Sequence, residues 1–99
     1  MTRQVNLVVN DKPIALDYFV QSFIDHTVDG MLSALEGVGE IKSADISIDG
    51  RKVAINVNNA VLPANPFVQQ IVRSVIVGMV SALKGVTDTS KVKVTTLTK

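Results

Sequence analysis

The side chains that could carry out chemistry are few in this chain. His26 is the only histidine, the residue type best suited to proton transfer or metal binding near neutral pH. Asp25 and Asp29 flank it, and on a helix Asp29 would lie within hydrogen-bonding reach. A metal or acid–base centre needs several converging groups, and no further ligand can be assigned near His26. We therefore expect an exposed, paired histidine, with no catalytic residue, cofactor or metal.

Sequence motifs of known enzyme classes are also missing. The chain has no GxSxG, no Walker loop, no HExxH, no EF-hand loop and no GxGxxG after a predicted strand. The segment GVGE, residues 37–40, follows a predicted helix, whereas a phosphate-binding loop precedes one, so we interpret it as a helix stop. The sequence predicts a protein that is not an enzyme.

Composition indicates one small folded domain, residues 1–99. The chain is 46% hydrophobic and 19% charged with a net charge of +1, which argues against disorder and leaves room for a single core. Its most apolar run, residues 71–83, is 13 residues long, whereas a membrane-spanning helix needs about 20. The absence of cysteine is typical of a reducing compartment. We expect a cytoplasmic protein that makes no membrane contact.

The sequence repeats itself at an interval of 48 residues. Unit one, residues 3–50, aligns with unit two, residues 51–98, without a gap and with 14 identical positions. Half of these identities fall in GMLSALEGV, residues 30–38, which matches GMVSALKGV, residues 78–86. So many identities in one register indicate a tandem duplication.

Strands are predicted at the start and end of each unit. Apolar residues alternate there with polar ones, which is typical of half-buried strands. The residues expected to face the core are Val5, Leu7, Val9, Ala44, Ile46 and Ile48 in unit one, and Val53, Ile55, Val57, Val92, Val94 and Thr96 in unit two. Asn10-Asp11 and Asn58-Asn59 are favourable turn residues, and a short extended arm could follow each turn.

A helix is predicted between the two strands of each unit. Asp17 and Asn65 are favoured N-caps, Pro66 suits the first helical position, and Gly37 and Gly85 are the expected stops. Apolar residues with helical spacing form one stripe in each helix. These are Val20, Phe23, Ile24, Val28, Met31, Leu32 and Leu35, and Val68, Ile71, Val72, Ile76, Met79, Val80 and Leu83.

The expected architecture is α+β. The order strand, helix, strand, hairpin, strand, helix, strand, with Asp49-Gly50 as the hairpin turn, predicts a ferredoxin-like βαββαβ sandwich. Its antiparallel sheet would carry both helices on one face. If the short arms pair as strands, the chain is instead a ββαβ unit used twice, with a similar core.

Small residues recur at equivalent helix positions. Glycine inside a helix costs about 1 kcal/mol relative to alanine, yet both units contain it, at Gly30 and Gly78. With Ala34 and Gly37, or Ala82 and Gly85, these glycines form a strip that would let another element approach closely. We favour packing of the two helices within the chain, with an intermolecular contact or a bound ligand as the alternatives.

Charge is divided between the two units. Residues 1–50 carry three bases and eight acids, a net charge of −5, whereas residues 51–99 carry seven bases and one acid, a net charge of +6. Opposite charges favour pairing of two unlike units over two like ones. The basic half could attract nucleic acid, but the aromatic residues all fall on predicted helices, which leaves no platform for base stacking on the sheet.

These observations favour a non-enzymatic binding or assembly module that associates with itself or with a protein partner. Val77, which stands where unit one has Asp29, and Val8 and Ala54 on the open sheet face are the expected apolar contacts. The alternatives, in order, are a small-ligand-binding regulatory domain and nucleic-acid binding through the basic half.

Overall fold

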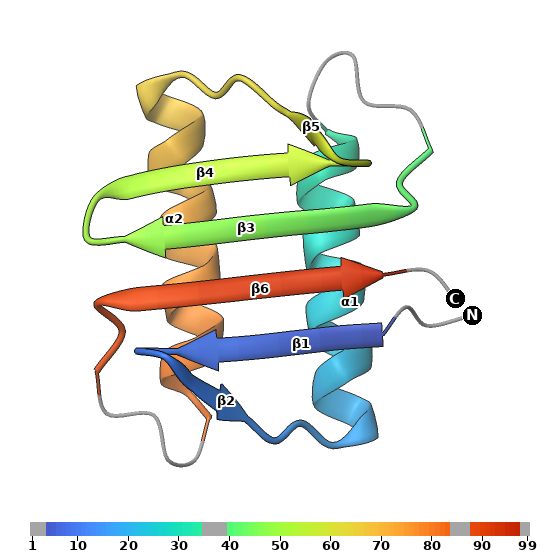
Figure 1. The fold of residues 1–99 in the computed structure, drawn as a ribbon, viewed down its shortest axis with the longest axis vertical. Coiled ribbons are helices and arrows are strands. Elements are labelled where there is room, and N and C mark those ends of the chain that lie inside the picture. The colour runs from blue at the N-terminus through green and yellow to red at the C-terminus, as the bar shows by residue number, and fades with distance from the viewer. Residues whose placement is uncertain (1–3, 35–39, 84–87, 98–99) are drawn as a thin grey trace.

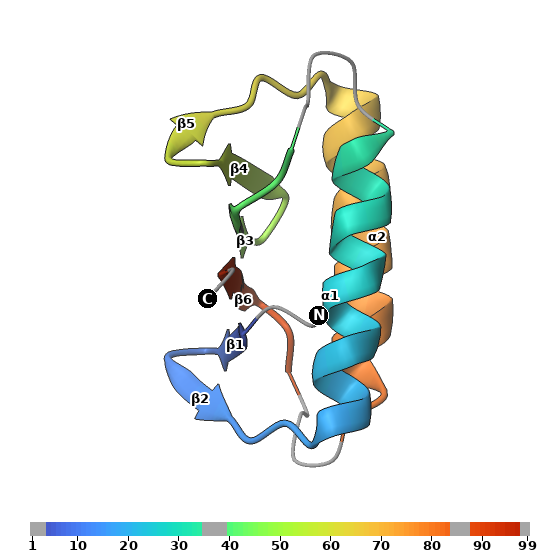
Figure 2. The ribbon, with the colours of Figure 1, turned by 90° about the vertical axis from the view of Figure 1, so that its right-hand side faces the viewer.

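The protein folds into a sheet with two helices on one of its faces. The computed structural model describes residues 4–34, 40–83 and 88–97. In chain order the elements are β1 (Gln4–Val9), β2 (Lys12–Ile14), α1 (Tyr18–Ser33), β3 (Ser43–Asp49), β4 (Lys52–Val57), β5 (Ala60–Val61), α2 (Pro66–Ser81) and β6 (Lys91–Leu97). The strands form one antiparallel sheet, and both helices cover the same face of it (Figures 1 and 2). The predicted α+β class is confirmed.

The order of the strands differs from the ferredoxin-like expectation. In that arrangement the first strand of each unit has a long strand on both sides. Here the order is β2-β1-β6-β3-β4-β5, so the last strands of the units, β6 and β3, are central. The two short arms explain the difference. Because β2 pairs with one edge of β1 and β5 pairs with one edge of β4, β1 and β4 can each pair with only one long strand. The alternative ββαβ order therefore describes both halves.

Tight turns with left-handed backbone hold the two arms. Asn10 and Asp11 have φ values of 50° and 66°, and Asn58 and Asn59 have φ values of 53° and 66°. Positive φ at both central residues is the pattern of a type I′ hairpin turn, and Asn and Asp tolerate this conformation better than other non-glycine residues. The predicted turn residues thus produce the arms.

The hairpin between the units lies one residue later than predicted. Asp49 pairs with Lys52 as the last residue of β3, so the turn consists of Gly50 and Arg51. Gly50 has a φ of 59°, whereas Arg51 is not among the residues with positive φ. A type II′ turn requires glycine at its first central position, so the place of Gly50 fixes the register of β3 against β4.

The elements of the two halves recur at the interval of the sequence repeat. β1, α1 and β3 begin and end 48 residues before β4, α2 and β6. Asp17 and Asn65 cap the helices as predicted, each accepting a hydrogen bond of 2.8 Å from the backbone amide three residues on. Pro66 occupies the first turn of α2, as predicted. The predicted stops, Gly37 and Gly85, lie outside the described residues.

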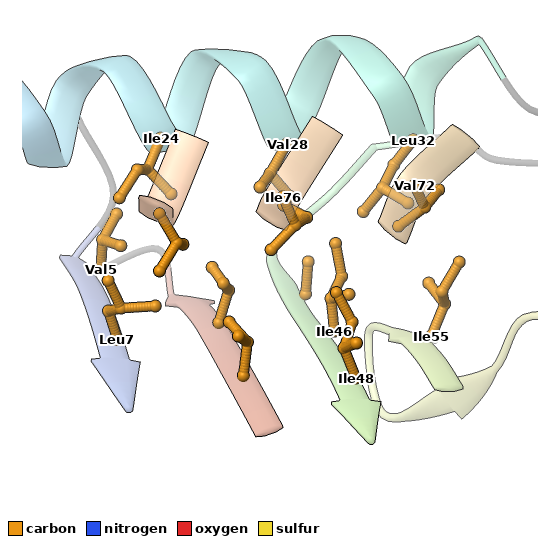
Figure 3. Close-up of a cluster of buried hydrophobic side chains, with 14 of the residues drawn as sticks. Val5, Leu7, Ile24, Val28, Leu32, Ile46, Ile48, Ile55, Val72 and Ile76 are labelled. Carbon is orange, nitrogen blue, oxygen red and sulfur yellow. The ribbon is translucent and has the colours of Figure 1, made fainter. Parts of the chain in front are cut away.

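A single core fills the space between the sheet and the helices (Figure 3). The predicted strand residues face it, with Val53 and Val57 only partly buried. Each helix contributes three buried apolar residues spaced by four, which are Ile24, Val28 and Leu32 in α1 and Val72, Ile76 and Val80 in α2. Phe23 and Ile71 were expected in this stripe but are 50% and 43% exposed, because the part of each helix that touches the sheet is narrower than predicted.

Candidate interface on the helix layer

The residues suited to chemistry do not form a reaction centre. His26 is exposed on α1, as expected. Asp25, its neighbour, is 2% exposed and belongs to the interior. In the described ranges, no three His, Cys, Asp or Glu side chains lie close enough together to hold a metal ion. No helix in these ranges is long and apolar enough to cross a membrane.

The strip of small residues faces away from the sheet. Gly30 and Gly78 are exposed, as are Ala34 and Ala82 at the helix C-caps. A Cβ atom added to either glycine would meet no atom of the described residues within 4 Å. Our favoured interpretation, that the strip packs the two helices together within the chain, is therefore wrong. The helices pack through the buried stripes on their inner sides instead, and the strip is left on the outer surface.

The other predicted contact residues are not brought together. Val77 is partly buried and packs against the core, so it is not an exposed apolar residue. Val8 and Ala54 lie on β1 and β4, which are separated by the two central strands of the sheet. No continuous apolar surface joins these three residues.

The open face of the sheet is mostly polar. On the four long strands, every side chain directed away from the core is polar or charged except Val8, Ala54 and Leu97. Thr95 donates a hydrogen bond of 3.0 Å to Asp45 across the two central strands. This polar surface is suited to contact with water. It does not support the expectation that another molecule covers the open face of the sheet.

Large apolar side chains instead stand on the outer side of the helix layer. Tyr18, Phe19 and Phe23 on α1 are 77%, 71% and 50% exposed, and Phe67 on α2 is 67% exposed. Phe23 was expected in the buried stripe, whereas no side of the helix was predicted for Tyr18, Phe19 and Phe67. The signal was present, because Phe19 and Phe67 recur at equivalent positions five residues before the first fully buried residue of each helix.

An apolar groove runs between the helices at one end of the layer. The helices are antiparallel, so the first turns of α1 lie beside the last turn of α2 (Figure 1). Phe19 and Phe23 form one wall of the groove, with ring centroids 6.1 Å apart and planes inclined by 42°. Met79, Ala82 and Leu83 form the opposite wall, and the groove has a volume of about 260 Å³.

The outer side of the helix layer carries no exposed charge in the described residues. Of the charged residues in α1 and α2, Asp25 is buried, and Asp29 and Arg73 are half-buried. The exposed residues of the two helices are Tyr18, Phe19, Phe23, His26, Gly30, Ser33, Pro66, Phe67, Gln70, Ile71, Ser74, Gly78 and Ser81. A solvent-facing helix surface is ordinarily rich in charged residues. We name this charge-free surface, together with Ala34 and Ala82, the helix face.

Comparisons with known proteins assign no function to this chain. No protein-family model, no curated protein and no solved structure matches the chain.

Proposed function

We propose that this protein is an assembly module whose helix face binds the helix face of a second copy. The observation that carries the proposal is that the described residues of the two helices expose aromatic rings but no fully exposed Asp, Glu, Lys or Arg side chain. Monomeric proteins rarely expose a large continuous apolar patch, and such patches mark surfaces that another molecule covers. We further propose that the chain arose by duplication of a ββαβ unit, which explains why both helices present the same kind of surface.

The arrangement of large and small residues supports a second copy as the partner. Each helix has its large exposed residues in the first half, at Phe19 and Phe67, and its exposed glycine and alanine in the second half. Because the helices are antiparallel, large residues occupy one diagonal of the face and small residues the other. Consider a second copy related by a two-fold axis parallel to the helices, with the two helix faces in contact. The large residues of each copy would then lie on the small residues of the other. Such a contact is self-complementary, as a two-fold interface must be.

The molecule is broad in the plane of its two layers, which favours a contact through one face. The molecule measures 36 × 31 × 18 Å, and its shortest dimension runs through the two layers. A standard protein interface needs about 800 Å² from each partner, which is less than the 36 × 31 Å outline of the molecule seen along its shortest dimension. Glycine and alanine on the face allow helices of two copies to approach closely.

The edges of the sheet are less suited to association. β2 has three residues and includes Pro13, and β5 has two residues. Short edge strands and proline are devices that prevent strands from pairing between molecules. Both arms also bend away from the helices, toward the side of the open sheet face (Figure 2). We therefore place the contact on the helices.

Sedimentation velocity at micromolar concentration tests this function. The wild-type chain should sediment as a dimer, at twice the monomer mass of 10.6 kDa. Phe19→Glu or Phe67→Glu introduces a charge into the face and should give a monomer with an unchanged far-UV circular dichroism spectrum. Val61→Glu is the matched control, since Val61 is 79% exposed on β5, away from the helices. A monomeric wild-type chain, or a dimer that survives both Phe variants, would refute the proposal.

A further inference from the structure

A second hollow lies on the other half of the molecule, where the turn between β3 and β4 meets the first turns of α2. Its lining residues are Arg51, Pro66, Gln69, Gln70 and Arg73, and its volume is about 550 Å³. This is larger than the apolar groove and falls in the range of pockets that hold small molecules, about 300–1,000 Å³. In contrast to the groove, its lining is dominated by long polar side chains.

The hollow has an excess of positive charge. Among the residues that the structure describes, two arginines and no acidic residue line it. Neither Arg51 nor Arg73 has an ion-pair partner among the residues that the structure describes. Two guanidinium groups on one hollow repel each other, and a bound anion would remove this repulsion.

Arg73 is held in place by the backbone. Its Nε donates a hydrogen bond of 2.7 Å to the carbonyl oxygen of Gly50, the residue directly before Arg51. This bond uses one of the five N–H groups of the guanidinium and leaves the two terminal nitrogens for another acceptor. Arg73 is also half-buried, so less side-chain freedom remains to be lost when a ligand binds.

One of the two glutamines is also fixed. Gln69 Nε2 donates a hydrogen bond of 2.9 Å to the carbonyl oxygen of Ala64, which leaves the amide oxygen of Gln69 as an acceptor for a hydroxyl or amino group. Two arginines offer more N–H donors than the two oxygens of a carboxylate can accept. The three terminal oxygens of a phosphate monoester match them better.

The equivalent place in unit one has the opposite character. Asp25 stands 48 residues before Arg73, and Tyr18 stands 48 residues before Pro66. The carboxylate of Asp25 is 2% exposed, so unit one buries an acid where unit two presents a base. The positive charge that Arg73 brings to the hollow therefore does not follow from the shared architecture.

From these observations we propose that the hollow binds the phosphate group of a small phosphate monoester, with Arg51 and Arg73 as the phosphate ligands and Gln69 as an acceptor for a polar group of the same molecule. The hollow borders the helix face, because Pro66 and Gln70 belong to both, whereas the two arginines do not belong to the helix face.

Titration of ¹⁵N-labelled full-length protein with inorganic phosphate, at constant ionic strength and with chloride as the reference anion, tests the site. Phosphate should shift the backbone signals of residues 51, 69, 70 and 73 and the Arg73 Nε–H signal in a saturable manner. Arg51→Gln should weaken binding about tenfold, the loss expected for one charge-assisted contact. Because Arg51 is an exposed turn residue, this variant should fold normally.

Lys93→Gln is the matched control, since it removes the same charge from the exposed surface of β6. It should change the affinity for phosphate less than twofold. Equal weakening by the two variants, shifts that do not saturate, or equally tight binding of acetate would each overturn the assignment. The same titration of Arg73→Gln tests the second arginine that we propose to bind the phosphate.

Discussion

Asn10 and Asn58 make similar hydrogen bonds at opposite corners of the sheet, and each binds the backbone of the other unit. Asn58 Oδ1 accepts from the backbone amides of Lys42 and Ser43 at 2.7 and 3.1 Å, at the entry of β3. Asn10 Oδ1 accepts from the amide of Lys91 at 3.0 Å, at the entry of β6. Their Nδ2 groups donate to the carbonyls of residues 40 and 88, at 2.8 and 3.0 Å. Each turn therefore positions the last strand of the opposite unit.

Replacement of Asn58 should separate the contribution of the side chain from that of the backbone. Asn58→Ala removes three hydrogen bonds and places alanine at a φ of 53°, and should cost about 2–3 kcal/mol of unfolding free energy. Asn58→Gly keeps the backbone relaxed and should cost about 1–2 kcal/mol. Urea denaturation measures both values.

Asn59→Gly serves as the control for these variants. Asn59 has a φ of 66° and its side chain makes no hydrogen bond within the described part of the chain. Its replacement should therefore change the unfolding free energy by less than about 0.5 kcal/mol. If Asn59→Gly is as damaging as Asn58→Gly, the hydrogen bonds to the β3 entry are not what stabilises this corner.

The two units are interlocked in the sheet. β6 of unit two lies between β1 and β3 of unit one, and β3 lies between β6 and β4 of unit two. In a fragment of residues 1–50, β1 and β3 therefore lack β6, which lies between them in the intact sheet. In a fragment of residues 51–99, β4 and β6 lack β3 in the same way. We expect each fragment alone to show no cooperative melting, and an equimolar mixture to recover the circular dichroism and melting of the intact chain.

The net charges of −5 and +6 on these fragments should make the mixed pair form faster at 0.1 M NaCl than at 1 M NaCl. Stopped-flow circular dichroism measures the rate, and sedimentation measures the mass. Cooperative melting of either fragment as a monomer would contradict the interlocked account.

Asp49 provides a local test of the charge division. It pairs with Lys52 on β4 and with Lys91 on β6, so one acid of unit one lies between two bases of unit two. Asp49→Lys brings three bases together and should cost about 1 kcal/mol at 0.1 M NaCl. The loss should shrink at 1 M NaCl, where the Debye length falls from about 10 to about 3 Å.

Glu40→Lys makes the same change of charge before β3, where only the backbone carbonyl of Glu40 is hydrogen-bonded. Its effect on the urea midpoint should be smaller than that of Asp49→Lys. Equal losses, or a loss that does not depend on salt, would show that the pairing of opposite charges across the central strands is not stabilising.

Much of the local structure could be predicted from the sequence. Alternating residues such as Val5 and Leu7 face the core, and Asp17 and Asn65 cap their helices. These features depend on neighbouring residues, so a local pattern is sufficient. The strand order was not predicted in the same way, because it depends on which edges the two short arms occupy after the turns at Asn10 and Asn58.

The aromatic part of the candidate interface was not predicted, and the strip of small residues was assigned first to packing within the chain, both for a physical reason. Helical periodicity placed Phe23 and Ile71 in the buried stripe. Periodicity indicates which residues lie on the same side of a helix, but it does not indicate how wide the part in contact with the sheet is. Gly30 and Gly78 were recognised as unusual, but the sequence could not show on which side of the helix layer they lie. Both questions are decided by the way the helices pack against the sheet.

The most direct test of the helix face is the double variant Gly30→Gln, Gly78→Gln, examined by sedimentation and by thermal melting at concentrations where the protein is monomeric. No atom lies within 4 Å of a Cβ added at either glycine, and removing a glycine from a helix interior is worth about 0.5–1 kcal/mol per site. The account predicts a more stable monomer that no longer dimerises, because the added side chains hold the two helix faces apart. A variant that gains stability and sediments as the same dimer as the wild-type chain would contradict it.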